Sequence, residues 1–429
     1  MMSSLRGAVV ALLVLFAVPA PAQGTDPLPR EAARLVGLFN GTERPEALFS
    51  AEFLAQVPAA QVTAIASSLR GQLGRATGVE QVTPEGPGSA RVVLGFERGT
   101  ASLRMVLGGA ASDRIVGLLI TGTAPRGDNA AAVDSDFAAL PGRAGYAVHR
   151  LGGPAPVRLA GREDARPFAL GSAFKLYVLA ELVRQVNAGE RRWTDVVPLG
   201  PRSLPSGITQ AWPPASPMTL HSFAALMISI SDNSATDTLL AVLGREKVEA
   251  MVERTGHADP RLNRPFLSTH ELFVLKGDGG GDYLRRWIAA DETGRRALLS
   301  EIARVDRSRF AYGTYSGSPK AIAEAEWFAS PDDLARLLNW LLANDRDGRA
   351  RAILAINPGA GADTPGLKYL GFKGGSEQGV LAAAHLLQTA DGQWYAVTAA
   401  WNDPAAPVDT PRFFGLLGRL IAQTATTGR

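Results

Sequence analysis

The chain has 429 residues, of which 46 % are hydrophobic and 20 % are charged, so it is long enough for two domains with ordinary globular cores. Lysine and arginine number 44 against 41 aspartate and glutamate, and no basic stretch marks a nucleic-acid-binding face. Cysteine is absent, which excludes disulfide bonds and thiol catalysis, and the five histidines lack the spacing of zinc ligands. We therefore expect a protein without a metal ion or other cofactor.

Residues 1–22 have the pattern of a secretory signal peptide. A single arginine, Arg6, precedes an apolar run over residues 8–18, and the small residues Ala20 and Ala22 are suited to cleavage. The apolar run is shorter than the roughly 20 residues that a membrane-spanning helix needs. An uncleaved anchor is the alternative. We expect cleavage and a periplasmic or secreted protein, with no stable membrane insertion after cleavage.

Residues 25–125 predict a small α+β domain. Apolar residues recur at helical spacing in its first half, and short β-rich runs fill its second half. The predicted helices cover residues 29–41, 45–57 and 59–74, and the predicted strands cover 78–83, 90–97, 101–107 and 115–121. Helices followed by antiparallel strands favour a curved sheet that wraps around a helix.

Residues 126–139 predict a linker, and residues 140–429 predict a second domain. Its first strands are expected over residues 144–151 and 156–160, and its last strands over residues 380–387 and 394–401. Helical patterns dominate between these pairs of strands. They include residues 282–289, 292–305 and 330–343, the last with Ser330 as a cap and Pro331 at its first position.

An apolar helical run over residues 170–182 contains one hydroxyl and one amine, those of Ser172 and Lys175. Residues three apart lie on one face of a helix, so the hydroxyl can reach the lysine nitrogen. Burial among residues such as Phe174 and Tyr177 would lower the lysine pKa, and the neutral amine could then take the serine proton. The alternative is a helix-start serine beside a lysine that extends to solvent.

A second stretch, Ser231-Asp232-Asn233, predicts a polar turn between two helices. Ser231 can relay a proton to a leaving group, and Asn233 can hold a substrate amide. Asp232 can brace the turn through hydrogen bonds with the backbone. An interhelical turn without a catalytic role is the alternative.

A third stretch, Lys373-Gly374-Gly375-Ser376, follows a strand predicted over residues 367–372. The two glycines let a ligand approach the backbone closely. Lys373 supplies positive charge for a carboxylate, and the Ser376 amide can point into an oxyanion hole. The alternative is a glycine-rich strand end with a surface lysine.

In this order, the three stretches resemble the motifs of the serine β-lactamase and penicillin-binding-protein superfamily, and most closely those of class A enzymes. The resemblance covers roughly residues 140–425. It implies an α/β (α+β) domain in which helices flank an antiparallel sheet, with the active site in a cleft between this sheet and a helical lobe.

The first domain resembles the ketosteroid-isomerase-like fold, also called cystatin-like or NTF2-like. Similar domains precede class A-like domains in a branch of secreted serine hydrolases found near clavulanic acid clusters. Isomerase activity is not implied, because residues 25–125 contain neither Tyr nor His, and Asp26 and Asp113 are their only aspartates. We expect this domain to be a scaffold or binding module.

The resemblance implies that Ser172 is the nucleophile, Lys175 its base and Ser231 the proton relay. The backbone amides of Ser172 and Ser376 would hold the oxyanion. The implied substrate-binding residues are Asn233, Lys373, Gly375 and Ser376.

Two positions depart from the class A pattern. Gly374 stands where the family usually has threonine or serine, which removes one hydroxyl contact to a substrate carboxylate. The segment after Gly256 lacks the glutamate that activates the deacylating water in class A enzymes. Glu271 is the acidic residue close by and is a candidate deacylation base, with a capping or surface role as the alternative.

We expect an exported serine hydrolase that forms an acyl-enzyme on Ser172, acts on β-lactams and deacylates slowly. An esterase or D-Ala-D-Ala-type peptidase with the same nucleophile is the nearest alternative. A non-catalytic cell-wall or ligand-binding protein is the alternative from another class. The expected partner is a small-molecule substrate, and no nucleic acid is expected.

Overall fold

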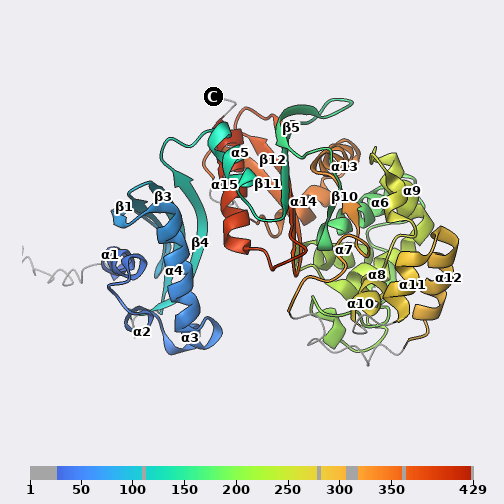
Figure 1. The fold of residues 1–429 in the computed structure, drawn as a ribbon, viewed down its shortest axis with the longest axis horizontal. Helices are drawn as coiled ribbons and strands as arrows, with labels where there is room; N and C mark the ends of the chain where they lie inside the picture. The colour runs from blue at the N-terminus through green and yellow to red at the C-terminus, as the bar shows by residue number, and fades with distance from the viewer. Residues whose placement is uncertain (1–26, 109–112, 278–281, 306–316, 360–363, 427–429) are drawn as a thin grey trace, which may run out of the picture.

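The computed structural model describes residues 27–108, 113–277, 282–305, 317–359 and 364–426 (Figure 1). The signal peptide expected over residues 1–22 lies outside this part of the chain. The described residues form two large antiparallel sheets, two short two-stranded sheets and many helices, so the predicted mixed α/β architecture is confirmed.

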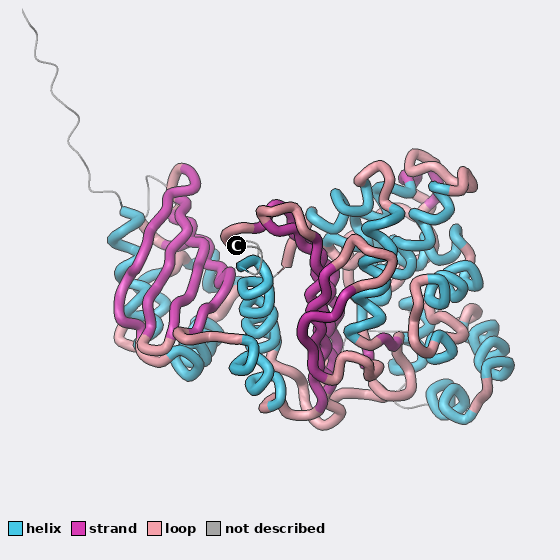
Figure 2. The backbone as a smooth tube through the Cα atoms, turned by 90° about the horizontal axis from the view of Figure 1, so that it is seen from above, coloured by secondary structure: helices cyan, strands magenta, loops and turns pink. Residues whose placement is uncertain are grey.

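The N-terminal part is a four-stranded antiparallel sheet with helices on one face (Figures 1 and 2). Its elements are α1 (Pro27–Asn40), α2 (Pro45–Leu48), α3 (Ala51–Gln56), α4 (Ala59–Leu73), β1 (Ala76–Gly86), β2 (Ser89–Phe96), β3 (Gly99–Leu107) and β4 (Ile115–Pro125). The single helix predicted over residues 45–57 is two short helices, because Phe49 is extended and Ser50 caps α3 by accepting a hydrogen bond from the Phe53 amide.

The second sheet has five antiparallel strands in the order β11-β12-β13-β5-β6, so strands from both ends of the second part of the chain pair with each other. They are β5 (Arg143–Arg150), β6 (Val157–Arg162), β11 (Leu367–Glu377), β12 (Val380–Thr389) and β13 (Trp394–Asn402). Two helices, α5 (Ala130–Ala138) and α15 (Thr410–Thr426), cover one face, and a helical lobe covers the other (Figure 2). Helix α15 also contacts β4, so it lies between the two sheets.

The helical lobe contains the segments that carry the first two motifs. Its elements are the 3-10 turn η1 (Gly171–Phe174), α6 (Lys175–Asn187), α7 (Leu220–Ser229), α8 (Asn233–Leu243), α9 (Arg245–Arg254), η3 (Pro260–Asn263), α10 (Thr269–Gly277), α11 (Asp282–Ala289), α12 (Glu292–Ile302), α13 (Pro331–Asn344) and α14 (Arg349–Ala355). The short segments β7 (Phe168–Ala169), β8 (Val196–Pro198), η2 (Thr209–Ala211), β9 (Pro217–Thr219) and β10 (Phe328–Ala329) connect them. The expected cap of α13 is present, since Ser330 and Asp333 form a capping box.

Helix α6 runs through the centre of the lobe. Residues 175–183 are all at most 3 % exposed, as expected for a helix surrounded by other helices and a sheet. The aromatic rings of Phe174 and Trp327 stack over the start of this helix, with ring centroids 3.6 Å apart. The first residue of α6, Lys175, is therefore fully buried beside packed aromatic rings.

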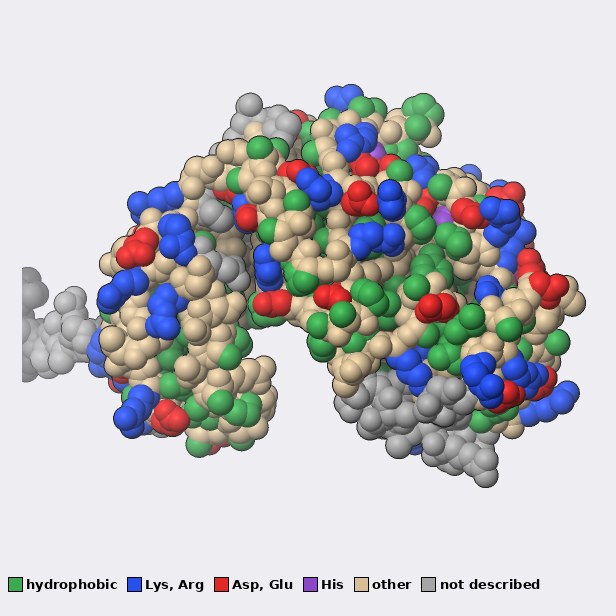
Figure 3. Space-filling model, in the orientation of Figure 1, with side chains coloured by type: hydrophobic (Ala, Val, Ile, Leu, Met, Phe, Trp, Pro, Cys, Tyr) green, Lys and Arg blue, Asp and Glu red, His purple; other side chains and the backbone are tan. Residues whose placement is uncertain are grey.

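The surface carries interspersed charges. On the face shown in Figure 3, basic and acidic side chains alternate, and neither sign gathers into one large patch. Within the described part of the chain, every helix falls short of the length and hydropathy needed to cross a bilayer.

Candidate active site

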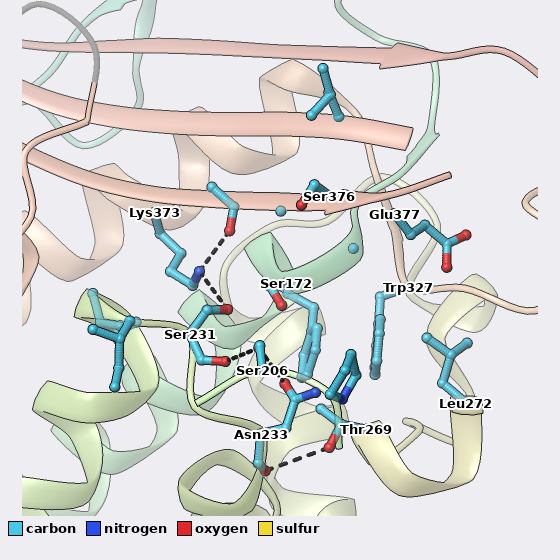
Figure 4. Close-up of a pocket in the computed structure, with 18 of the residues that line it drawn as sticks. Ser172, Ser206, Ser231, Asn233, Thr269, Leu272, Trp327, Lys373, Ser376 and Glu377 are labelled. Carbon is cyan, nitrogen blue, oxygen red and sulfur yellow. Dashed lines mark hydrogen bonds between the residues drawn. The ribbon is translucent and has the colours of Figure 1, made fainter. Parts of the chain in front are cut away.

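Ser172 lies in the 3-10 turn η1 and not in the α-helix that the sequence predicts, and Lys175 is the first residue of α6. Residues three apart also share a face in a 3-10 turn. The hydrogen-bond partners of Lys175 Nζ are oxygen atoms of Ser231 and Asn233, so direct contact between the Ser172 hydroxyl and Lys175 stays a prediction. Ser172 lines a cavity of about 510 Å³ between β11 and the helical lobe. Ser231, Lys373 and Ser376 line the same cavity, and Figure 4 shows Ser172 at its centre.

Lys175 is fully buried beneath this cavity. Its Nζ atom donates hydrogen bonds to Ser231 O at 2.7 Å, Asn233 Oδ1 at 2.7 Å and Ser231 Oγ at 2.9 Å. Burial, and after it the positive charge of Lys373, holds the pKa of Lys175 well below its ordinary value. These three bonds use all three protons of an ammonium. Loss of one proton leaves two N–H donors for the three oxygen atoms and a lone pair that can accept a proton from a neighbouring hydroxyl.

The turn between α7 and α8 presents Ser231 to both lysines. Ser231 has a φ of +59°, a left-handed conformation that is uncommon for a residue with a side chain. Such strain persists only where surrounding contacts determine it, and it gathers at functional sites. Here the hydroxyl of Ser206 donates a hydrogen bond to the backbone oxygen of Ser231 at 2.6 Å, and the backbone amide of Asn233 donates one to the backbone oxygen of Ser206 at 2.9 Å.

Asp232 braces this turn, as predicted. Its Oδ1 accepts hydrogen bonds from the Ala235 amide at 2.9 Å and the Thr209 hydroxyl at 2.6 Å. Its Oδ2 accepts hydrogen bonds from the Ile208 and Thr209 amides, each at 2.8 Å. The carboxylate therefore caps α8 and fastens the residue 208–209 segment to the turn.

Asp232→Ala is expected to destabilise the protein by about 3–5 kcal/mol, because it leaves buried donors without partners and removes a helix cap. Acylation should fall as well, since Ser231 would lose its fixed position. Thermal unfolding and labelling of the variant measure both effects. The matched control is Asp291→Ala, which removes the exposed cap of α12 and should cost only about 1 kcal/mol. An equal, small loss in both variants would contradict the bracing role.

Asn233 lines the cavity, but both polar ends of its side chain have partners in the protein. Its Oδ1 accepts from Lys175, and its Nδ2 donates to Leu204 O at 3.0 Å. In this arrangement Asn233 positions the lysine. Contact between Asn233 and a substrate amide stays a prediction. It requires Asn233 Nδ2 to give up its hydrogen bond to Leu204 O and to donate to the substrate instead.

Lys373 approaches Ser231 from the sheet. Its Nζ donates to Ser231 Oγ at 3.1 Å and to Gly374 O at 2.6 Å, and its side chain is buried. Burial lowers the pKa of Lys373 to about 7. The Ser231 hydroxyl thus lies between two buried lysine nitrogens, which is the arrangement a proton relay needs.

Gly171 and Gly375 let the backbones of η1 and β11 touch. A Cβ on Gly375 would lie 2.0 Å from Leu170 O and 2.6 Å from the Ser172 nitrogen, and one on Gly171 would lie 2.8 Å from the Ser376 nitrogen. The amides of Ser172 and Ser376 are therefore held on two segments in direct contact, beside the nucleophile. This contact supports the predicted pair of oxyanion donors and explains why no larger residue fits at position 375.

The glycine at position 374 has a local cause. A Cβ on Gly374 would lie 2.6 Å from Cζ of Phe372, whose ring in turn packs on His385 with centroids 4.7 Å apart. The phenylalanine ring thus occupies the space that a threonine or serine side chain would need. Position 374 therefore supplies no hydroxyl group next to Lys373 for contact with a substrate carboxylate.

Glu271 is not among the residues that line the cavity. Its Oε1 accepts from Arg245 Nη2 at 2.6 Å, its Oε2 accepts from the Ser268 amide at 2.7 Å, and its own amide donates to Ser268 Oγ at 3.2 Å. These reciprocal bonds cap α10. The structure therefore shows the capping role that the sequence left as the alternative, and it does not support Glu271 as a deacylation base.

Sequence reasoning missed several cavity residues: Ser206, Glu326, Trp327 and Glu377. The pattern around Ser206 contains no local signal for its bond to Ser231 O. Glu377 could have been found, because alternation along a strand places it on the same face as Lys373 and Gly375. Glu326 and Trp327 reach the cavity only because β10 pairs with β7, just ahead of the nucleophile.

Residues 129–425, well over half of the chain, match the model of the "Beta-lactamase enzyme family". The chain belongs to this family. It is accordingly a serine hydrolase of the superfamily that contains β-lactamases and penicillin-binding proteins. No curated protein sequence matches the chain.

Similar solved structures include a beta-lactamase from Sphaerobacter thermophilus, which is 23 % identical with a TM-score of 0.47 and covers 70 % of this chain and 97 % of its own. A beta-lactamase from Chitinophaga pinensis is 16 % identical with a TM-score of 0.48 and covers 70 % and 98 % of the two chains. A mutant of PBP-A, in an acyl-enzyme complex with penicillin G, is 17 % identical with a TM-score of 0.47 and covers 70 % and 95 %.

Proposed function

We propose that this protein is an exported, class A-like serine hydrolase that forms an acyl-enzyme on Ser172 with β-lactams. One observation carries the proposal: Ser231 Oγ lies 2.9 Å from Lys175 Nζ and 3.1 Å from Lys373 Nζ, directly beside the cavity that Ser172 lines. A nucleophile, a neutral base and a proton relay are thereby combined at one cleft.

The proposed reaction begins when the neutral amine of Lys175 takes the Ser172 hydroxyl proton. The Ser172 oxygen then bonds to the substrate carbonyl carbon, and the amides of Ser172 and Ser376 hold the resulting oxyanion. When the tetrahedral intermediate collapses, the carbon–nitrogen bond breaks and the nitrogen takes a proton from Ser231. The Lys175 ammonium returns a proton to Ser231, and Lys373 binds the substrate carboxylate.

Ser172→Ala is expected to abolish covalent labelling by a fluorescent penicillin, because no other hydroxyl occupies its position between base and oxyanion donors. Intact mass spectrometry gives the stoichiometry of the adduct. The control is Ser300→Ala on the exposed face of α12, which should label like the parent protein. Labelling of the Ser172 variant at the parent's stoichiometry would exclude this nucleophile.

The same preparations separate β-lactamase from esterase and peptidase activity. We would test three substrates, one for each activity: a chromogenic cephalosporin for β-lactamase, a p-nitrophenyl ester for esterase and a D-Ala-D-Ala peptide for peptidase activity. Turnover of none, with no adduct on Ser172, would favour a binding protein that retains the fold.

We further propose that deacylation is slow. Both oxygens of Glu326, the carboxylate next to η1, have donors: Oε2 accepts from the Gly171 and Trp327 amides, and Oε1 accepts from Lys276 Nζ at 3.0 Å. Burial, and next the charge of Glu326, raises the pKa of Glu377 well above its ordinary value. Glu326 therefore has no oxygen atom free to orient a hydrolytic water, and Glu377 is bound to the same lysine, Lys276.

Penicillin hydrolysis is therefore expected to show a burst of about one equivalent followed by slow turnover, with an adduct that persists on Ser172. Glu271→Gln should leave the lifetime of that adduct unchanged, because Glu271 acts at the start of α10. Stopped-flow hydrolysis with timed mass spectra measures both quantities. Fast turnover without a burst would overturn the proposal, and a longer adduct lifetime in the glutamine variant would restore Glu271 as the base.

A further inference from the structure

The cavity has oppositely charged groups at its two ends. Figure 4 shows Lys373 at one end, Glu377 at the other and Ser172 between them. Lys373, Gly375 and Glu377 alternate along β11, so their side-chain positions share the face that lines the cavity. At about 3.3 Å per residue, the α-carbons of Lys373 and Glu377 are separated by roughly 13 Å.

The acidic end is a buried cluster of two carboxyl groups around one ammonium. Lys276, in the last turn of α10, donates to Glu326 Oε1 at 3.0 Å and also to Glu377 Oε1. Its side chain is 3 % exposed, against 0 % for Glu326 and 18 % for Glu377. Both glutamates line the cavity, and Glu377 is the more exposed of the two carboxyl groups.

The charges in this cluster do not balance when both carboxyl groups are ionised. Among the described residues, Lys276 is the lysine that forms ion pairs with both Glu326 and Glu377. The ammonium group of Lys320 instead donates a hydrogen bond to the backbone carbonyl of Lys276. The pKa of Lys276 is raised, because the attraction of Glu326 and Glu377 outweighs the effect of burial, so its charge is retained. Either Glu377 holds a proton, or a further cation must approach it from the cavity.

Resting on the proposed function, we propose that Glu377 selects acyl donors that carry an amino group on the acyl side of the scissile carbonyl. The substrate lies along the edge strand β11, with its carboxylate at Lys373 and its carbonyl at the Ser172 and Ser376 amides. Its ammonium group lies against Glu377 and supplies the missing positive charge of the cluster. Ionised Glu377 and the ligand ammonium then form a charge-assisted hydrogen bond in a partly dehydrated site.

The test compares ampicillin with penicillin G, which differ by one amino group in the acyl side chain. Calorimetry on the Ser172→Ala protein measures binding without acylation, so the result does not depend on turnover. Ampicillin is expected to bind about tenfold more tightly than penicillin G, the size of a charge-assisted hydrogen bond. Glu377→Gln in the same background should reduce this ratio to about one, and Glu377→Asp should retain part of it.

Glu324→Gln is the matched control, since it removes the same charge from an exposed residue two positions before Glu326. It should keep the full preference for ampicillin. Equal binding of the two penicillins by the Ser172→Ala protein, or an unchanged ratio in the Glu377→Gln variant, would overturn the inference. Failure of the proposed function is seen separately, as the absence of an adduct on the parent protein with either penicillin.

Discussion

Replacing Lys175 with arginine is expected to slow acylation by about 10²–10⁴-fold, the usual contribution of a general base. Arginine stays protonated at every accessible pH, so it cannot take the Ser172 proton. It is also larger, and Lys175 is fully buried with three short hydrogen bonds to oxygen atoms. The measurement is the second-order rate constant for labelling by a fluorescent penicillin.

The pH dependence of the acylation rate distinguishes loss of the base in the Lys175→Arg variant from a general distortion of the active site. The pKa of Lys175 is lowered in the folded protein, so its neutral, active form is populated above this lowered value. The acylation rate of the parent protein should therefore rise with pH through an apparent pKa well below that of free lysine, and this rising limb should be absent from the arginine variant. Loss of the Lys373 proton, whose pKa is about 7, should produce a falling limb in both proteins, because that charge binds the substrate carboxylate. Lys247→Arg, at an exposed lysine that pairs with Glu190, serves as the control. Rapid acylation by the Lys175→Arg protein would exclude Lys175 as the base.

Gly375→Ala is expected to abolish labelling and to destabilise the protein by about 3 kcal/mol or more. The added methyl group would lie 2.0 Å from Leu170 O and 2.6 Å from the Ser172 nitrogen, and both of these are backbone atoms. Since no side chain can rotate to relieve the clash, η1 must move away from β11. That movement separates the two oxyanion donors.

The control for this change is Gly122→Ala in β4, where an added methyl group meets no atom within 4 Å. Its stability should stay within about 0.5 kcal/mol of the parent value. Thermal unfolding and penicillin labelling of both variants give the comparison. A Gly375→Ala protein that labels at the parent rate would show that the contact between η1 and β11 does not position the amides.

The motif residues could be predicted from sequence because their chemistry is local. The spacing of Ser172 and Lys175 places two side chains on one face, and Asp232 at a helix start is a cap whatever surrounds it. The five strands of the second sheet were also predicted from alternating or apolar segments bounded by turn residues. The strand predicted over residues 367–372 is longer, because β11 continues to Glu377 and includes the Lys373-Gly374-Gly375-Ser376 motif as part of the ladder with β12. Family membership, shown by the match over residues 129–425, agrees with that local evidence.

Glu271 shows where local reasoning failed. Its position beside the expected loop made it a candidate base, but its partner Arg245 comes from α9, 26 residues earlier in the chain. The carboxyl groups that do reach the cavity, Glu326 and Glu377, are paired with Lys276, 50 and 101 residues away in sequence. No periodicity or spacing encodes such distant pairs.

The order of residues along the chain sets which groups are available for chemistry: a serine and a lysine three apart, a polar turn that begins a helix and a lysine followed by two glycines. The tertiary structure decided how reactive they are, because a lysine pKa depends on burial and on neighbouring charge. Lys175 becomes a base only when α6 is enclosed by the lobe and Lys373 arrives from β11, 198 positions later in the chain. The packing of η1 on β11 likewise decided the oxyanion site, since that contact depends on two backbones meeting across the core.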